Sequence, residues 1–308
     1  MSELDTQPAK NPPTPLPLDE RLYVLKPEAS AFFKSHTGIH DDDALKSHIL
    51  DVQAKAYKIF PYPCIRFLGF TETTIYNLPA YQHVLKLGQE RKGAILLDIG
   101  CCFGGDVRKA VADGFPVQNV IASDLHAEFW DLGHELFKST PETFPASFIS
   151  GDAFDVSYLE AVPPIYDAVE TTVPKLNTVT TLNALRGHIS ALHAAAFFHL
   201  FSEEQQLAVG RSLAPLLSPL PGSVIFGYHI GKKEKGLIEM FGHTLFCHCP
   251  ETWAAMWDGV VFAKGTVRVD VKLQEKRPSM ELSPKVTGNI PAEEAKAMMW
   301  LVWSVTRL

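Results

Sequence analysis

From residue 94 onward, short apolar runs alternate with segments of helical spacing, and this alternation constrains the fold more than any other feature of the chain. The apolar runs read "AILLDIG", "NVIASDL", "ASFISGDAF", "HISALHAAA" and "GSVIFGYHI". Helix-like segments include "GDVRKAVADG", "AEFWDLGHELFK" and "SEEQQLAVGRSLAPLL". Strands that alternate with helices predict an α/β fold, with a mostly parallel sheet and helices on both of its faces.

The end of the chain departs from this alternation. After the predicted helix "CPETWAAMWDGV", the runs "GTVRVDVKL" and "MMWLVWSVTRL" follow without another helix. Two strands that lack a crossover helix predict an antiparallel pair at one edge of the sheet.

The residues before the alternation form two further segments. Residues 1–19 are rich in proline and predict a disordered tail. Residues 40–58 place apolar side chains at helical spacing behind an acidic cluster, which indicates an amphipathic helix, and an aromatic-rich stretch follows. We therefore divide the chain into a tail (1–19), an N-terminal helical cap or lid (20–92) and an α/β domain (93–308).

Composition narrows the classes of function. The 308 residues carry a net charge of −7, which argues against a general nucleic-acid binder. No apolar run is long enough to span a membrane, and the N-terminus lacks the apolar segment of a secretory signal. Five cysteines, two of them adjacent, do not form a disulfide framework. We expect a cytoplasmic protein that acts on a small molecule; the oligomeric state stays open.

The stretch "LLDIGCCFGGD", residues 96–106, is the corner between the first strand and its helix. Gly100 permits a tight turn, and Gly104 and Gly105 allow the backbone to approach a ligand closely. No Lys-Ser or Lys-Thr pair follows, which excludes a P-loop, and the dinucleotide pattern G-x-G is broken. The acid at Asp98 would repel a pyrophosphate but suits a cofactor that carries an ammonium group.

Two more acids end the next two strands. Asp124 ends the second strand, where a carboxylate accepts hydrogen bonds from ribose hydroxyls. Asp152 ends the third strand, where it would accept from an adenine amino group. A single acid at a strand end is weak support because turns are rich in aspartate, whereas three acids on consecutive strand ends are much stronger.

These stretches, with "HAAAFFHLFSEEQQ", "LAPLLSPLPGSVIFG" and "CPETWAAMWDG", resemble the fungal class I S-adenosylmethionine-dependent methyltransferases of terpenoid and meroterpenoid biosynthesis. The resemblance runs from about residue 57 to the C-terminus, except that the connection between residues 165 and 187 looks longer than usual. It implies a Rossmann-like, seven-stranded sheet whose last strand is antiparallel, and S-adenosylmethionine as the cofactor.

The resemblance also implies a cofactor site. It assigns the methionine part to Asp98, Gly100 and Gly104, the ribose to Asp124, the adenine to Asp152 and Ala153, and places Leu125 and Ala195 in the same site. Tyr62 and Arg66, ahead of the first strand, are candidates to reach the cofactor carboxylate. The alternative is that their segment simply packs the cap onto the sheet.

Methyl transfer mainly requires that an acceptor lone pair be held in line with the methyl group. A carboxylate acceptor needs no base, whereas a hydroxyl benefits from one, and the candidate bases are His199 and His229, after the fourth and fifth strands. For each of them the alternative is a buried structural histidine.

Aromatic and large apolar residues near the carboxyl ends of the predicted strands predict a pocket for a largely apolar natural product. The substrate-binding candidates are Phe60, Phe197, Tyr228, Met240, Phe241 and Trp253. The stretch "HTLFCHC" lacks the ligand spacing of a zinc site, so we expect no metal. Two other functions remain in competition: a methyltransferase-like scaffold without turnover, and a nicotinamide dehydrogenase, which the broken G-x-G and Asp98 disfavour.

Overall fold

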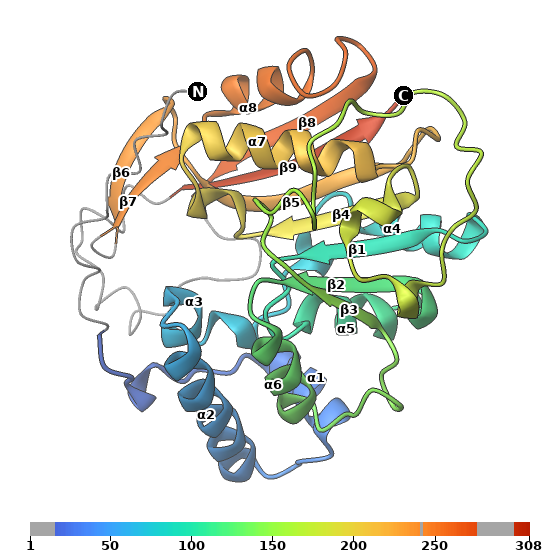
Figure 1. Cartoon of the computed structure of the whole chain (residues 1–308). Coiled ribbons are helices and arrows are strands. Elements are labelled where there is room, and N and C mark those ends of the chain that lie inside the picture. Colours follow the sequence, from blue (N-terminus) through green and yellow to red (C-terminus); the bar gives the residue numbers. More distant parts are fainter. Residues whose placement is uncertain (1–15, 241–242, 276–298) are drawn as a thin grey trace.

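The computed structural model describes residues 16–240, 243–275 and 299–308. Its centre is a seven-stranded sheet in the order β3-β2-β1-β4-β5-β9-β8 (Figure 1). The strands are β1 (Ile95–Ile99), β2 (Val120–Asp124), β3 (Ser147–Ser150), β4 (Ile189–Ala195), β5 (Val224–Gly231), β8 (Val267–Gln274) and β9 (Met299–Arg307). Strands β1 to β5 pair in parallel, and β9 runs antiparallel to both β5 and β8. The predicted sheet with an antiparallel last strand is confirmed.

Burial explains why these runs form strands at these places. Every residue of β1 and of β5 is buried, as expected for central strands covered on both faces. Along β8, buried or half-buried positions largely alternate with exposed ones, which fits a strand at the sheet edge. The antiparallel pair predicted at the edge is therefore β8 and β9, with β9 inserted beside β5.

Helices cover both faces of the sheet. They are α1 (Pro27–Thr37), α2 (Asp42–Ile59), α3 (Pro63–Arg66), α4 (Tyr81–Glu90), α5 (Gly105–Ala112), α6 (Ala127–Leu136), α7 (Glu203–Leu213) and α8 (Pro250–Trp257). Leu96 points to the face covered by α4, α5, α6 and the cap. Its neighbour Leu97 points to the face covered by α7 and α8. Because successive side chains of β1 point to opposite faces of the sheet, each face has its own hydrophobic core.

Short 3-10 turns connect several elements. They are η1 (Glu20–Leu22), η2 (Gly69–Thr71), η3 (Ile75–Asn77), η4 (Val117–Asn119), η5 (Leu176–Thr178), η6 (Leu182–Leu185), η7 (Phe198–Leu200) and η8 (Ala214–Leu216). The turns η5 and η6 occupy the connection between β3 and β4 that the sequence marks as unusually long.

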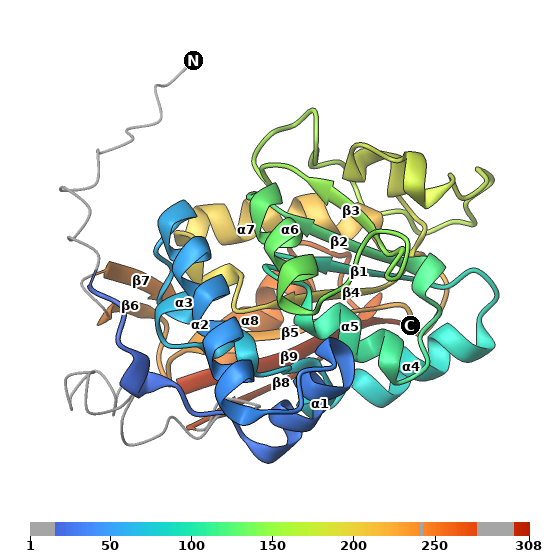
Figure 2. The ribbon, with the colours of Figure 1, turned by 90° about the horizontal axis from the view of Figure 1, so that it is seen from below.

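The cap is attached firmly to the α/β part, and Figures 1 and 2 show α2 beside α6. The rings of Phe33 and Phe137 stack with centroids 5.1 Å apart. His48 Nε2 lies 3.0 Å from the carbonyl oxygen of Leu136. Cap residues therefore share one hydrophobic core with the sheet. The division at residue 92 stays a prediction.

Most of the predicted tail, residues 1–15, lies outside the described residues. The residues that follow contact the cap: the Leu16 carbonyl accepts a hydrogen bond of 2.7 Å from the Tyr57 hydroxyl, and the Pro17 carbonyl accepts one of 3.2 Å from Arg66 Nε.

One element was not predicted. Strands β6 (Gly236–Met240) and β7 (His243–Cys247) follow β5 and precede α8 in the sequence, and they form a separate two-stranded sheet, seen at the left of Figure 1. Ile238, Met240 and Cys247 are buried, so one face of this hairpin packs against the hydrophobic core.

Candidate active site

The glycine corner connects β1 to α5 through three residues in the left-handed backbone region. Gly100, Cys102 and Gly104 have φ values of 70°, 50° and 68°. The Gly100 N–H donates to the Ser123 carbonyl of β2 over 2.8 Å, which fixes the start of the turn. A Cβ on Gly100 would lie 2.8 Å from the Phe197 ring, and one on Gly104 would lie 2.5 Å from the Trp130 ring. Protein side chains therefore fill the space beside both glycines. The sequence did not reveal this reason for having glycine at these two positions.

Asp98 lies within the corner strand and is almost fully buried. Its Oδ1 lies 2.8 Å from Nδ1 of His193, the residue opposite it on β4. Burial raises the pKa of the Asp98 carboxyl; the charge and hydrogen bond of His193 oppose this rise, and Asp106 and Asp124 add to it. Burial lowers the pKa of His193, but Asp98 more than offsets this, so the imidazole pKa lies above its ordinary value.

Asp124, at the end of β2, is half-buried and anchored by backbone groups. Its Oδ2 accepts a hydrogen bond of 2.8 Å from the Cys102 N–H, and its Oδ1 accepts one of 3.0 Å from the His126 N–H. Each carboxylate oxygen retains a second lone pair for a ligand hydroxyl. Burial raises the pKa of this carboxyl.

Tyr62 brings the cap to the end of β2. Its ring packs against Phe60 at 4.3 Å and lies 6.3 Å from the His126 ring. Burial, with the charge of Asp124 next in importance, raises the pKa of Tyr62 to about 12. The phenol therefore stays protonated at neutral pH and remains a hydrogen-bond donor near Asp124.

Asp152 follows β3 and is exposed, while Ala153 beside it is half-buried. The Asp152 Oδ1 accepts a hydrogen bond of 2.9 Å from the Phe154 N–H, which closes a local turn. Because β1, β2 and β3 are neighbours in the sheet, their three acids line one edge. Carboxylates along this edge fit a cofactor with an ammonium group and ribose hydroxyls, and do not fit a pyrophosphate.

Arg66 has different partners from those predicted. Its side chain is buried, its Nε donates to the Pro17 carbonyl, and its guanidinium lies 4.7 Å from the Phe67 ring centroid. Within the described residues its Nη1 is buried without a hydrogen-bond partner. These contacts connect Arg66 to the start of the described chain and support the packing alternative for this residue.

The chain after β4 closes the other side of the corner. Ala195 is half-buried, and Ala196, with φ 50°, donates its N–H to the Tyr228 carbonyl over 2.7 Å. Phe197 packs over Gly100. Its ring meets Phe201 at 5.1 Å. Since Phe201 in turn meets Phe154 at 5.1 Å, an aromatic row leads from the glycine corner to the loop after β3.

The two candidate bases are engaged in hydrogen bonds. His199, on η7, is half-buried, and its Nδ1 accepts from the Ile230 N–H over 3.3 Å. His229 is buried, and its Nδ1 accepts from Trp303 Nε1 over 3.0 Å. An imidazole that accepts at Nδ1 carries its proton on Nε2 when neutral, so neither neutral ring has a second acceptor nitrogen. Burial lowers the pKa of His229 well below its ordinary value, which keeps this ring neutral.

The predicted substrate residues divide into three groups. Phe60 is 44% exposed. Phe197, Tyr228, Met240 and Trp253 are buried. Trp253 packs against Phe198, His229 and Trp303 in the core on the α7 and α8 side of the sheet. Phe241 lies outside the described residues. In the structure Trp253 is thus a core residue, and its aromatic character alone gave no means of distinguishing core from pocket.

Two further side chains were missed. His193 was not singled out, because only the register of β1 and β4 brings it to Asp98. Asp106 accepts hydrogen bonds from the Thr74 N–H at 2.6 Å, the Thr74 hydroxyl at 2.8 Å and the Ile75 N–H at 3.0 Å. It thereby fixes the cap to α5. The acid of "GGDVRK" was visible, but nothing in the sequence indicated its partner.

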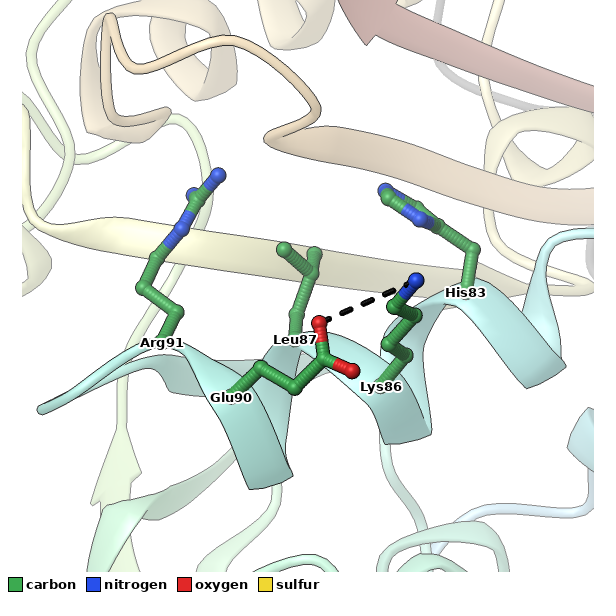
Figure 3. A pocket seen from close by; sticks show the side chains of 5 residues that line it. All are labelled: His83, Lys86, Leu87, Glu90 and Arg91. Atoms are coloured by element: carbon green, nitrogen blue, oxygen red, sulfur yellow. Dashed lines mark ion pairs between the residues drawn. The ribbon is translucent and has the colours of Figure 1, made fainter.

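A cavity of about 270 Å³ lies elsewhere, beside α4 and the turn before β5 (Figure 3). His83, Lys86, Leu87, Glu90 and Arg91 line it. Arg91 donates to the Ser223 hydroxyl at 2.7 Å, and His83 Nε2 lies 2.6 Å from the Gly222 carbonyl oxygen. Because β5 starts at Val224, this cavity is at the amino end of the strands, opposite the three acids, and its polar groups hold the turn.

The part of the chain that the structure describes contains no group of three or more histidine, cysteine or acidic side chains suited to a metal. Each of the five cysteines, all within that part, is a free thiol. None of the described helices is long and apolar enough to cross a membrane.

Comparisons with known proteins bear on both parts of the chain. Residues 18–71 match the family described as the meroterpenoid methyltransferase N-terminal domain. The chain is 30% identical over 251 residues to the O-methyltransferase phiE of Fungal sp. (strain ATCC 74256), covering 81% of this chain and 75% of that protein. It is 28% identical to the asnovolin E/chermesin D methyltransferase nvfJ of Aspergillus novofumigatus, over 85% and 86% of the two chains.

Among solved structures, a 1,6-didemethyltoxoflavin-N1-methyltransferase of Burkholderia thailandensis has a TM-score of 0.47 and 10% identity, covering 85% of this chain and 90% of that one. The two relatives similar in sequence cover 81% and 85% of this chain. The chain therefore belongs to the fungal class I S-adenosylmethionine-dependent methyltransferases of terpenoid and meroterpenoid biosynthesis.

Proposed function

We propose that this methyltransferase methylates a carboxylate oxygen of a small, largely apolar natural product. A hydroxyl acceptor is the second candidate, because both are oxygen nucleophiles. The observation that carries the proposal is the state of the two histidines at the strand ends: each accepts a hydrogen bond at Nδ1, so its neutral ring has no lone pair left to remove a proton. The name of the relative phiE, an O-methyltransferase, supports an oxygen acceptor.

S-adenosylmethionine supplies an electrophilic methyl group on its sulfonium. We assign its ammonium group to Asp98, its ribose hydroxyls to Asp124 and its adenine amino group to Asp152. The anchoring of Asp124 by two backbone N–H groups supports its part, because a fixed carboxylate binds hydroxyls without first losing conformational freedom.

His199 suits an orienting role better than a base role. The hydrogen bond that the Ile230 N–H donates to its Nδ1 holds the ring in one orientation beside β5. A carboxylic acid is ionised at neutral pH, with an ordinary pKa of about 4, so this acceptor needs no base. His229, enclosed by Trp253 and Trp303, we assign to packing.

Exposed apolar side chains at this edge support an apolar acceptor. Leu125, Phe154 and Leu200 follow β2, β3 and β4 with exposed fractions of 55%, 40% and 48%, and Phe60 adds 44% from the cap. Large exposed apolar side chains near convergent polar groups are typical of a ligand-binding edge. A net charge of −7 supports the absence of a nucleic-acid partner. The cytoplasmic location stays a prediction.

Methyl-labelled cofactor and paired acceptors test the proposal. Each pair consists of one terpenoid or aromatic acid and the corresponding primary alcohol. We expect label in the acid, released by mild alkali because the product is an ester. Label only in the alcohol, in an alkali-stable ether, would overturn the carboxylate assignment.

A further inference from the structure

We propose that His193 is a positioning residue that keeps the Asp98 carboxylate ionised and aimed for the ammonium group of the cofactor. This inference rests on the role proposed for Asp98. Nothing in the sequence pattern of the cofactor site points to His193, which lies in the middle of β4, 95 residues from Asp98.

The sheet brings the pair together. Asp98 on β1 and His193 on β4 are register partners on adjacent parallel strands, so their side chains emerge on the same face. Nδ1 of His193 and Oδ1 of Asp98 are 2.8 Å apart. The Phe226 ring of β5 lies 5.0 Å from the imidazole and limits its movement on the other side.

Only one member of the pair is accessible. The His193 side chain has 0% of its surface exposed, whereas the Asp98 side chain retains 5%. A cationic ligand therefore reaches the carboxylate and not the imidazole. Within the described residues, Nε2 of His193 is buried without a hydrogen-bond partner, so the ring makes its one polar contact with Asp98.

The surroundings explain why Asp98 requires this partner. Burial favours the protonated carboxyl, and the neighbouring charges that act on the pair are acidic: Asp106 from α5 and Asp124 from β2. Phe226, the contact from β5, supplies no charge. Without the charge and the hydrogen bond of His193, the pKa of Asp98 would rise further, which would weaken the attraction of this carboxyl for an ammonium group.

Two amide substitutions separate this role from simple packing. In His193→Asn the side-chain amide takes the place of Nδ1 and donates to Asp98. In His193→Gln the amide takes the place of Nε2, so the Asp98 contact is lost while the polarity of the side chain stays. Calorimetry with S-adenosylhomocysteine, which carries the ammonium group, gives the affinity of each variant from about pH 6 to about pH 9.

We expect His193→Gln to bind about tenfold more weakly than the wild type near neutral pH, and His193→Asn, which restores the hydrogen bond but not the charge, to lose less affinity. Both affinities should recover as the pH rises and Asp98 ionises. Methylthioadenosine, which lacks the amino-acid part, should bind all three proteins equally. Equal losses in both variants, a loss for methylthioadenosine as well, or a pH-independent loss would overturn the inference.

The variant Asp98→Asn distinguishes this inference from the proposed function. If Asp98→Asn binds S-adenosylhomocysteine normally, the ammonium role of Asp98 itself is wrong. If Asp98→Asn binds weakly but His193→Gln binds like the wild type, the role of Asp98 stands and only the role of His193 fails. A thermal unfolding curve for each variant shows that the protein compared is folded.

Discussion

The Cys102 N–H donates a hydrogen bond of 2.8 Å to Oδ2 of Asp124, and this contact ties the glycine corner of β1 to the end of β2. Cys102 adopts a φ of 50° at this point of the turn. The adjacent cysteines therefore contribute backbone geometry to the site. Burial raises the pKa of both thiols well above the ordinary value, so they are poor nucleophiles at neutral pH.

Asp124→Ala should weaken cofactor binding by at least about tenfold, because it removes the acceptor proposed for the ribose hydroxyls. It should also lower the free energy of unfolding by about 1–3 kcal/mol, since the N–H groups of Cys102 and His126 lose their partner. Asp124→Asn is the matched control, because it retains one oxygen. Calorimetry with S-adenosylhomocysteine that gives the same affinity for both variants and the wild type would contradict the ribose role.

Gly104→Ala should destabilise the protein by about 2 kcal/mol or more. Alanine is strained at φ 68°, and its Cβ would lie 2.5 Å from the Trp130 ring. Gly105→Ala is the control, because its Cβ would meet nothing closer than 3.9 Å. Urea unfolding measures both variants; equal stabilities would show that the packing at Gly104 is not what excludes a side chain.

Acid should destabilise the protein through two buried histidines, His229 and His248. Burial lowers the pKa of His248 from 6.5 to about 4, and lowers that of His229 as well. These rings are neutral in the folded chain, while the unfolded chain takes up protons below about pH 6.5. Stability is therefore fully present above about pH 6.5 and falls as the pH drops toward about 4, by at most about 1.4 kcal/mol per pH unit for each ring.

His248→Asn checks this pH dependence. The asparagine amide can occupy the place of Nδ1, which lies 2.9 Å from the Thr252 hydroxyl, but it does not titrate. Urea unfolding across the acidic range should show a shallower loss of stability than in the wild type. An identical slope would mean that His248 does not contribute.

The sequence predicts the sheet and the three acids because both depend on local patterns. Apolar runs that end in Asp98, Asp124 and Asp152 are visible in one pass along the chain. The partner of Asp98 is not visible in this way, because the contact with His193 depends on strand register. The same limit applies to Trp253, since an aromatic residue near a strand end packs equally well in a core or in a pocket. The β6–β7 hairpin was missed because its segment lacks a clear alternation.

The dependence of methyl transfer on pH tests the central claim most directly. With an acid acceptor and saturating cofactor, neither His199 nor His229 has to remove a proton during the reaction. The account predicts that the rate of transfer is flat from about pH 6 to about pH 9. A rate that rises tenfold per pH unit through neutrality, and then levels off, would reveal a catalytic base and contradict the account.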